Sequence, residues 1–138
     1  MIYSFTVQGI PKAQGRPRVF RNKHTGKVHA VDPETAKDWK RTIQAQVLAS
    51  PERPQAPLAT ALELAAEFFL PKPKYLQKRR LPPPPHVTKP DLDNLLKALK
   101  DACSGILYLD DSQICRYANI AKRYSDTPGV TFSLMEIP

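Results

Sequence analysis

The chain has 138 residues and a formal net charge of +8, with 21 lysines and arginines against 13 aspartates and glutamates. This length predicts one domain, residues 1–138, and a transmembrane protein is excluded because no apolar run approaches the roughly 18 residues that span a bilayer. Two cysteines, Cys103 and Cys115, are too few for a disulfide framework or a zinc site.

The amino-terminal sequence does not have the form of a secretory signal, so we expect a cytoplasmic protein. In that reducing compartment both cysteines are expected to be small buried residues. Hydrophobic residues make up 41% of the chain and prolines number 15. Such a chain would gain stability from dimerisation, although composition does not establish it.

The positive charge is concentrated in two segments. The N-terminal basic segment (residues 12–31) and the proline-rich segment (residues 71–90) each hold six lysines or arginines and no acid, which leaves 9 basic and 13 acidic residues elsewhere. This distribution indicates a polyanionic partner such as nucleic acid. The alternative is that both segments are solubilising loops.

The first third of the chain predicts two strand regions and a helix. Residues 2–8 alternate apolar and polar side chains, which is typical of a half-buried strand. Arg16 and Arg18 follow in a loop, and their guanidinium groups suit phosphate oxygens. Residues 19–31 are expected to form a hairpin around residues 22–26.

A helix is expected from Asp32, where a cap residue, a proline and an acid occur in sequence, to the Ser50-Pro51 stop. Trp39 could stack on a base, but its place in the apolar stripe of this helix favours the core. Residues 58–70 have helix-favouring composition but strand-like alternation, and we predict a strand because burial outweighs propensity.

The proline-rich segment includes four consecutive prolines, so no regular element is expected in it. Its position directly before Asp91 favours a role in holding a nucleic-acid backbone. Its expected DNA-binding residues are Lys72, Lys74, Lys78, Arg79, Arg80 and Lys89. Tyr75 could stack on a base, and the histidines of the chain, His24, His29 and His86, are expected to be solvated, with His86 a remote candidate for a general base.

The next predicted helix begins at Asp91, which is a favourable N-cap residue, and runs to about Cys103. Its apolar residues recur at helical spacing. Asp93, Lys97 and Lys100 fall on a different face of the helix, so two carboxylates and an ammonium group meet near its N-terminus.

A second acidic pair, Asp110-Asp111, stands where a strand is predicted to begin, and adjacent strand residues point to opposite faces. We therefore expect one of them to join Asp91 and Asp93 around a shared cation. Three carboxylates suit Mg²⁺ or Mn²⁺, and Lys97 is placed to contact an anionic substrate oxygen. Capping and surface charge are the alternative explanation.

The remaining sequence predicts a strand over 112–124, a turn at Pro128-Gly129 and a final antiparallel strand. The order of elements indicates an α+β domain, with a mixed sheet and two main helices packed on one side.

The motifs Asp-Leu-Asp-Asn-Leu-x-Lys-x-x-x-Asp-Ala and Leu-Asp-Asp-x-Gln-Ile closely resemble those of the RusA family of Holliday-junction resolvases. The Gly15-Arg16-Pro17-Arg18 segment and the Lys122-Arg123-Tyr124 stretch extend the similarity over nearly the whole chain. The resemblance implies a homodimeric, metal-dependent endodeoxyribonuclease of a kind frequent in phages and prophages, which resolves four-way junctions in recombination and repair.

By this resemblance the catalytic and metal-binding residues are Asp91, Asp93 and Asp111, with Lys97 stabilising the phosphate or orienting water. Asp110 is either a further ligand or a structural residue. A C2 dimer would place two equivalent sites on a junction for paired nicks, and the protein would be nucleoid-associated when bound to DNA. The alternatives are a non-catalytic nucleic-acid-binding protein and a nuclease acting mainly on other branched DNA.

Overall fold

The computed structural model describes residues 1–15, 18–31, 36–78 and 82–138. Its elements, in chain order, are β1 (Ile2–Gln8), β2 (Arg18–Arg21), β3 (Val28–Val31), α1 (Lys37–Ala49), β4 (Ala61–Pro71), α2 (Lys74–Gln77), α3 (Leu92–Cys103), the 3₁₀ helix η2 (Asp111–Gln113), β5 (Ile114–Ser125) and β6 (Gly129–Ile137). The predicted α+β class is confirmed. Within these ranges no helix combines the length and apolarity needed to cross a bilayer.

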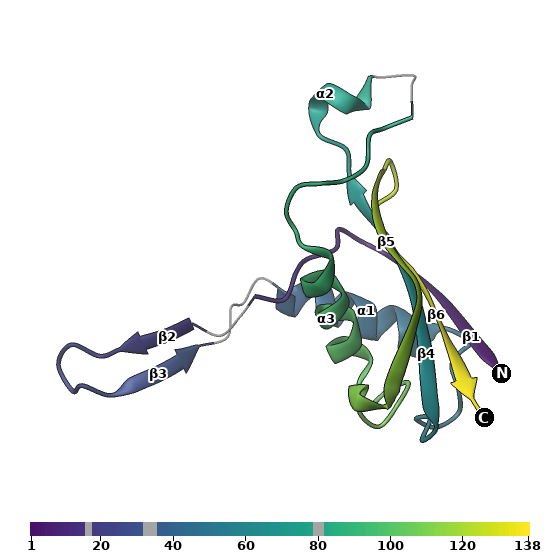
Figure 1. The fold of residues 1–138 in the computed structure, drawn as a ribbon, viewed down its shortest axis with the longest axis horizontal. Helices are drawn as coiled ribbons and strands as arrows, with labels where there is room; N and C mark the ends of the chain where they lie inside the picture. The colour runs from purple at the N-terminus through teal and green to yellow at the C-terminus, as the bar shows by residue number, and fades with distance from the viewer. Residues whose placement is uncertain (16–17, 32–35, 79–81) are drawn as a thin grey trace.

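A four-stranded mixed sheet in the order β1-β6-β4-β5 forms the centre of the fold (Figure 1). β4 and β5 are parallel, whereas β6 runs antiparallel to both β1 and β4. Parallel neighbours need a crossover connection, and the chain between β4 and β5 provides one that contains α3. α1 and α3 lie on the same side of the sheet, as predicted.

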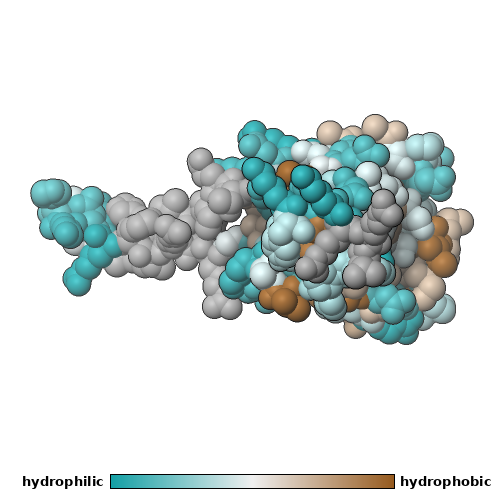
Figure 2. Space-filling view, turned by 90° about the horizontal axis from the view of Figure 1, so that it is seen from above, coloured by the Kyte–Doolittle hydropathy of each residue, from teal (hydrophilic) through white to brown (hydrophobic). Residues whose placement is uncertain are grey.

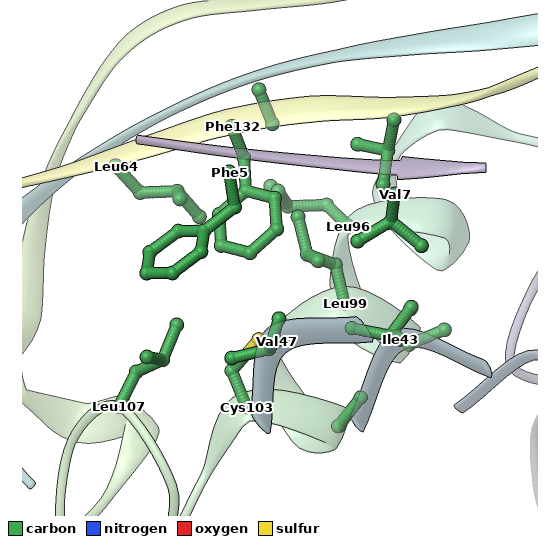
Figure 3. Packing of buried hydrophobic residues seen from close by; sticks show 14 of the residues in the cluster. Phe5, Val7, Ile43, Val47, Leu64, Leu96, Leu99, Cys103, Leu107 and Phe132 are labelled. Carbon is green, nitrogen blue, oxygen red and sulfur yellow. The ribbon is translucent and has the colours of Figure 1, made fainter. Parts of the chain in front are cut away.

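The core lies between this sheet and the two helices (Figure 3). Alternate residues of β4 are buried, which confirms the strand prediction for this stretch and overrides its helical composition. Phe5 and Phe132 stack across β1 and β6 with ring centroids 5.1 Å apart. The helices contribute Trp39, Ile43, Val47, Leu95, Leu96, Leu99 and Cys103, so the core placement of Trp39 is confirmed.

The predicted hairpin is confirmed: β2 pairs with β3, and Asn22 Oδ1 accepts hydrogen bonds from the backbone of His24 and Thr25 in the turn. Gly26 has a φ of +69°, which favours glycine. The hairpin lies apart from the sheet in Figure 1, and its tip is hydrophilic in Figure 2. The predicted opening of the first helix at residues 32–34 falls outside the described residues, and α1 begins at Lys37.

Three expectations are wrong. The proline-rich segment is not wholly irregular, because β4 continues to Pro71 and α2 forms one short helix after Pro73, whose ring is compatible with a helix start. Cys103 is buried as expected, but Cys115 is exposed on the edge strand β5. His86 is only 8% exposed, because it packs against Tyr124.

Candidate functional site

Asp91 occupies the N-cap position of α3, and its carbonyl oxygen accepts the Leu95 amide at 3.1 Å. Its carboxylate makes no capping hydrogen bond within the described residues. Asp91 Oδ2 instead accepts from Lys89 Nζ at 2.9 Å, with 46% of the Asp91 side chain exposed. The expected cap position is therefore confirmed but the expected cap bond is not, because the charged lysine offers a stronger donor than a backbone amide.

Asp93 lies in the first turn of α3 and is exposed, and its Oδ1 accepts from the neighbouring Asn94 amide at 3.0 Å. Lys97 is one turn further on and also exposed, without a partner among the described residues. Lys100, by contrast, donates to Tyr117 Oη at 2.7 Å. The structure thus brings Asp91, Asp93 and Lys97 to one accessible helix end, where the helix dipole favours negative charge.

Segments distant in the chain meet at the start of α3. Lys122 of β5 donates from Nζ to the carbonyl oxygens of Thr88 and Pro90, at 2.8 Å each. On the N-terminal side, the Gln14 amide donates to the Asn94 carbonyl at 3.1 Å. These contacts hold the backbone before and after Asp91 in place.

Sequence reasoning missed this anchoring role of Lys122. Its signal is the spacing Ile120, Lys122, Tyr124, which puts a lysine on the apolar, half-buried face of a strand.

Asp110 has a structural role. It caps η2 in a capping box, in which Asp110 Oδ2 accepts from the Ser112 amide at 3.0 Å and Gln113 Oε1 accepts from the Asp110 amide at 2.8 Å. Hydrogen bonds from the Ser112 side chain and backbone lower the pKa of Asp110. β5 begins only at Ile114, so the acidic pair opens a 3₁₀ turn and not the predicted strand.

β5 begins beside the C-terminal end of α3 (Figure 1), and Asp111 stands three residues before β5, whereas Asp91 and Asp93 stand at the N-terminal end of α3. Gln113 anchors η2 to the start of β4 through the carbonyl oxygens of Leu58 and Thr60. β5 then runs back along α3, and only at Lys122 does it reach Pro90. At about 3.3 Å per strand residue this return covers on the order of 26 Å.

The expectation that Asp111 joins Asp91 and Asp93 within one chain is therefore wrong. Among the described residues no three metal-ligating side chains gather at one point. The physical reason is the topology. β5 is parallel to β4, so both strands start at the same end of the sheet, whereas the crossover helix α3 begins at the other end, where β4 finishes.

The predicted DNA-binding residues are only partly described. Lys74, the first residue of α2, and Lys78, directly after this helix, are exposed, and Lys72 pairs with Asp126 at 3.2 Å. The end of the molecule seen in Figure 2 is largely hydrophilic, with small separate apolar patches. Arg16, Arg79 and Arg80 fall outside the described residues, and only the backbone of Arg18 is described, in β2.

A cavity of about 560 Å³ lies beside the start of α3, and Lys89 and Pro90 form part of its lining. His86 and Tyr124 face each other in its wall, with ring centroids 4.7 Å apart. Burial lowers the pKa of His86, and the nearby Lys122 ammonium lowers it further. Both effects favour the neutral imidazole over the charged one.

Two comparisons with known proteins follow from the same sequence. Residues 8–135 match the family model described as endodeoxyribonuclease RusA. The chain is also 36% identical over 144 residues to the uncharacterized protein YqaN of Bacillus subtilis (strain 168), an alignment that covers 96% of this chain and 95% of that protein. The region matched by the family model contains both acidic pairs and the whole of both basic segments.

Proposed function

The chain belongs to the RusA endodeoxyribonuclease family, and on that premise we propose that it is a Mg²⁺-dependent homodimeric endonuclease that resolves four-way DNA junctions by paired nicks. The observation that carries this proposal is the accessible start of α3, where the Asp91 carboxylate makes no capping bond, Asp93 is exposed and bonds only to the adjacent Asn94 amide, and Lys97 is unpaired among the described residues. Action on cytoplasmic DNA and a phage or prophage origin belong to the same proposal, on the resemblance alone.

The donor set at this helix end fits a hard divalent cation. Mg²⁺ is commonly bound by one or two protein carboxylates together with water and substrate phosphate oxygens, and Asp91 and Asp93 offer two. Mn²⁺ prefers similar ligands and is expected to substitute. Lys89 pairs with Asp91 at 2.9 Å, and a cation bound directly to Asp91 Oδ2 would take the place of this ammonium group.

A bound divalent cation supplies activation of water and neutralisation of charge on the phosphate in phosphodiester hydrolysis. The residues of the chain have separate tasks. Asp91 and Asp93 hold the cation on the rigid first turn of α3, and Lys97 donates to a non-bridging phosphate oxygen as negative charge develops there. Lys122 keeps the backbone around Pro90 in position through its two hydrogen bonds.

Asp111 can serve this site only if a second copy provides it. β5 is an edge strand, its residues 115–119 are exposed, and Leu109 and Tyr117 are among the exposed large apolar side chains. A two-fold axis beside β5 and α3 would run the two copies antiparallel, so that the beginning of one β5 lies near the end of the other. Asp111 of each copy would then approach the Asp91 and Asp93 pair of its partner.

A dimer of this kind also matches the substrate. A four-way junction is close to two-fold symmetric, and its resolution requires nicks in two opposing strands. Two sites related by a C2 axis meet that requirement, whereas one site could cut only one strand at a time. The basic residues of the proline-rich segment, next to Asp91 in the chain, would contact the phosphates that flank each nick.

The test is cleavage of a synthetic four-way junction with and without Mg²⁺, by wild type and by Asp93→Asn. We expect paired nicks in opposing strands only for wild type with Mg²⁺. Forks and linear duplex of the same sequence are the matched substrates. Binding without cleavage under all conditions would instead identify a non-catalytic junction-binding protein, and equal cleavage of forks would identify a broader branched-DNA nuclease.

A further inference from the structure

The cavity beside the start of α3 has the size and place of a ligand site. Its volume of about 560 Å³ falls within the roughly 300–1,000 Å³ typical of small-molecule pockets. Leu70 and Pro71 at the end of β4 and Tyr124 at the end of β5 contribute to its lining. The carboxyl ends of parallel strands are where open sheets of mixed α/β proteins bind ligands.

The walls of this cavity suit a flat aromatic group. They combine the His86–Tyr124 ring pair with apolar side chains from three separate segments, among them Ile10, which is 50% exposed. The His86 side chain is buried, with only 8% of the residue exposed, and its Nδ1 has no hydrogen-bond partner among the described residues. A buried polar atom without a hydrogen-bond partner is costly in free energy, so this wall lacks a partner for His86 Nδ1 that a ligand could supply.

The rim of the cavity suits an anion attached to such a group. Lys12, Lys72 and Lys89 line it, and no acidic side chain does so in the part of the chain that the structure describes. Lys72 and Lys89 are bonded to Asp126 and Asp91, whereas Lys12 is exposed and unpaired among the described residues. A planar ring that stacks through its faces and is joined through a sugar to a phosphate is the chemistry of a nucleotide.

We propose that this cavity holds a nucleobase that is unstacked from the branch point of the DNA substrate, with its phosphate at the lysine rim. The inference rests on the proposed nuclease function and adds a second contact to it. Asp91 directly follows Pro90 of the cavity lining, so a base held here would position the adjoining backbone at the proposed metal site. Unstacking a base costs least where pairing is already interrupted, which favours a branch point over continuous duplex.

The test is a binding cycle between single bases of the junction and the cavity. Abasic residues are placed one at a time at the nucleotides around the branch point, and junction affinity is measured without divalent ions for wild type and Tyr124→Ser. We expect one abasic position to weaken wild-type binding by about ten-fold, the scale of base–aromatic stacking. Tyr124→Ser should bind the intact junction about ten-fold more weakly than wild type does. An abasic residue at the sensitive position should weaken the binding of Tyr124→Ser no further.

Two controls separate stacking from general damage. Tyr124→Phe keeps the ring and should keep the abasic effect. Tyr75→Ser removes an aromatic side chain of the proline-rich segment that is 69% exposed and lies outside the cavity lining. The abasic effect should persist in this variant. The wild-type abasic scan needs no variant to fold, so it tests the proposal even if Tyr124→Ser is unstable.

Equal wild-type affinity for all abasic junctions, or effects of Tyr124→Ser and the abasic position that simply add, would overturn the cavity proposal. If wild type still cuts junctions in that case, the proposed nuclease function stands without it. Failure of wild type to bind any branched DNA would overturn both.

Discussion

The two acidic pairs near opposite ends of α3 each begin a helical turn but differ in what their carboxylates contact. At η2, Asp110 is engaged in a capping box and its pKa is lowered by the Ser112 hydrogen bonds. At the start of α3, Asp91 stands at the N-cap without capping, and Asp93 bonds only to the adjacent amide. A capping side chain generally contributes about 0.5–2 kcal/mol to helix stability. Asp110 makes such a capping bond and Asp91 does not, although both occupy N-cap positions.

This difference indicates where function is to be sought. A carboxylate that accepts a capping hydrogen bond from the backbone can be explained by its contribution to folding alone. Asp91 and Asp93 are not used in that way, and neither is Asp111, whose carbonyl oxygen accepts the Ile114 amide but whose carboxylate has no hydrogen bond among the described residues. On this comparison we propose that Asp110 has a structural role and that the other three acids take part in the chemistry, a division that substitutions can test.

The largest expected effect is that of Asp91→Asn on cleavage. Removing a metal ligand should lower the junction cleavage rate by more than about 100-fold, because second-shell substitutions alone typically cost 10–100-fold at metal sites. Junction affinity should be unchanged or higher, since the lysines remain and a repulsive charge is lost. Loss of binding by a folded Asp91→Asn protein would contradict this division of roles.

Mixing variants tests whether Asp111 acts across the dimer. Asp91→Asn and Asp111→Asn should each be inactive, but together they should regain roughly a quarter of the wild-type sites, because half of randomly mixed dimers are mixed and each contains one intact site. The measurement is nicking of a junction by the refolded mixture. Asp91→Asn mixed with Asp93→Asn is the matched control and should stay inactive; equal recovery in both mixtures, or in neither, would argue against a shared site.

A smaller effect is expected from the lysines of the proline-rich segment. Each phosphate contact on duplex DNA adds about 0.9 to the magnitude of the slope of log affinity against log salt concentration, so Lys78→Ala should lower this magnitude by about one. Lys40→Ala removes the same charge from α1, where Lys40 pairs with Asp101 at 2.6 Å, and should leave the slope unchanged. A nearly flat salt titration of wild type would exclude phosphate contacts as the main source of affinity.

The smallest effect is that of Asp110→Ala, which should lower the thermal unfolding midpoint while junction cleavage is retained. Because hydrogen bonding lowers the pKa of Asp110 from its ordinary value of 3.8, its stabilisation is complete above that pH and is lost as pH falls through the lower folded-state pKa. Wild type and Asp110→Ala should therefore differ at neutral pH and converge in strong acid. A cleavage defect as large as that of Asp111→Asn would show that Asp110 and Asp111 do not have the separate structural and chemical roles proposed for them.

The sequence by itself determined the local elements. Alternation identified β1 and β4, the apolar spacing from Leu95 to Cys103 identified α3, and the turn residues around Asn22 identified the hairpin. These predictions succeeded because each depends on side chains within a few positions of one another. The acid-free composition of the two basic segments was equally local information.

Only the tertiary structure decided which distant side chains meet. The parallel pairing of β4 and β5 separated Asp111 from Asp91 and Asp93 by the length of α3, and it brought Lys122 to Pro90 and His86 to Tyr124 instead. A period of two or of 3.6 residues specifies the face on which a side chain lies, but not the direction in which a strand joins the sheet. That direction follows from burying the whole apolar surface of the sheet and helices at once.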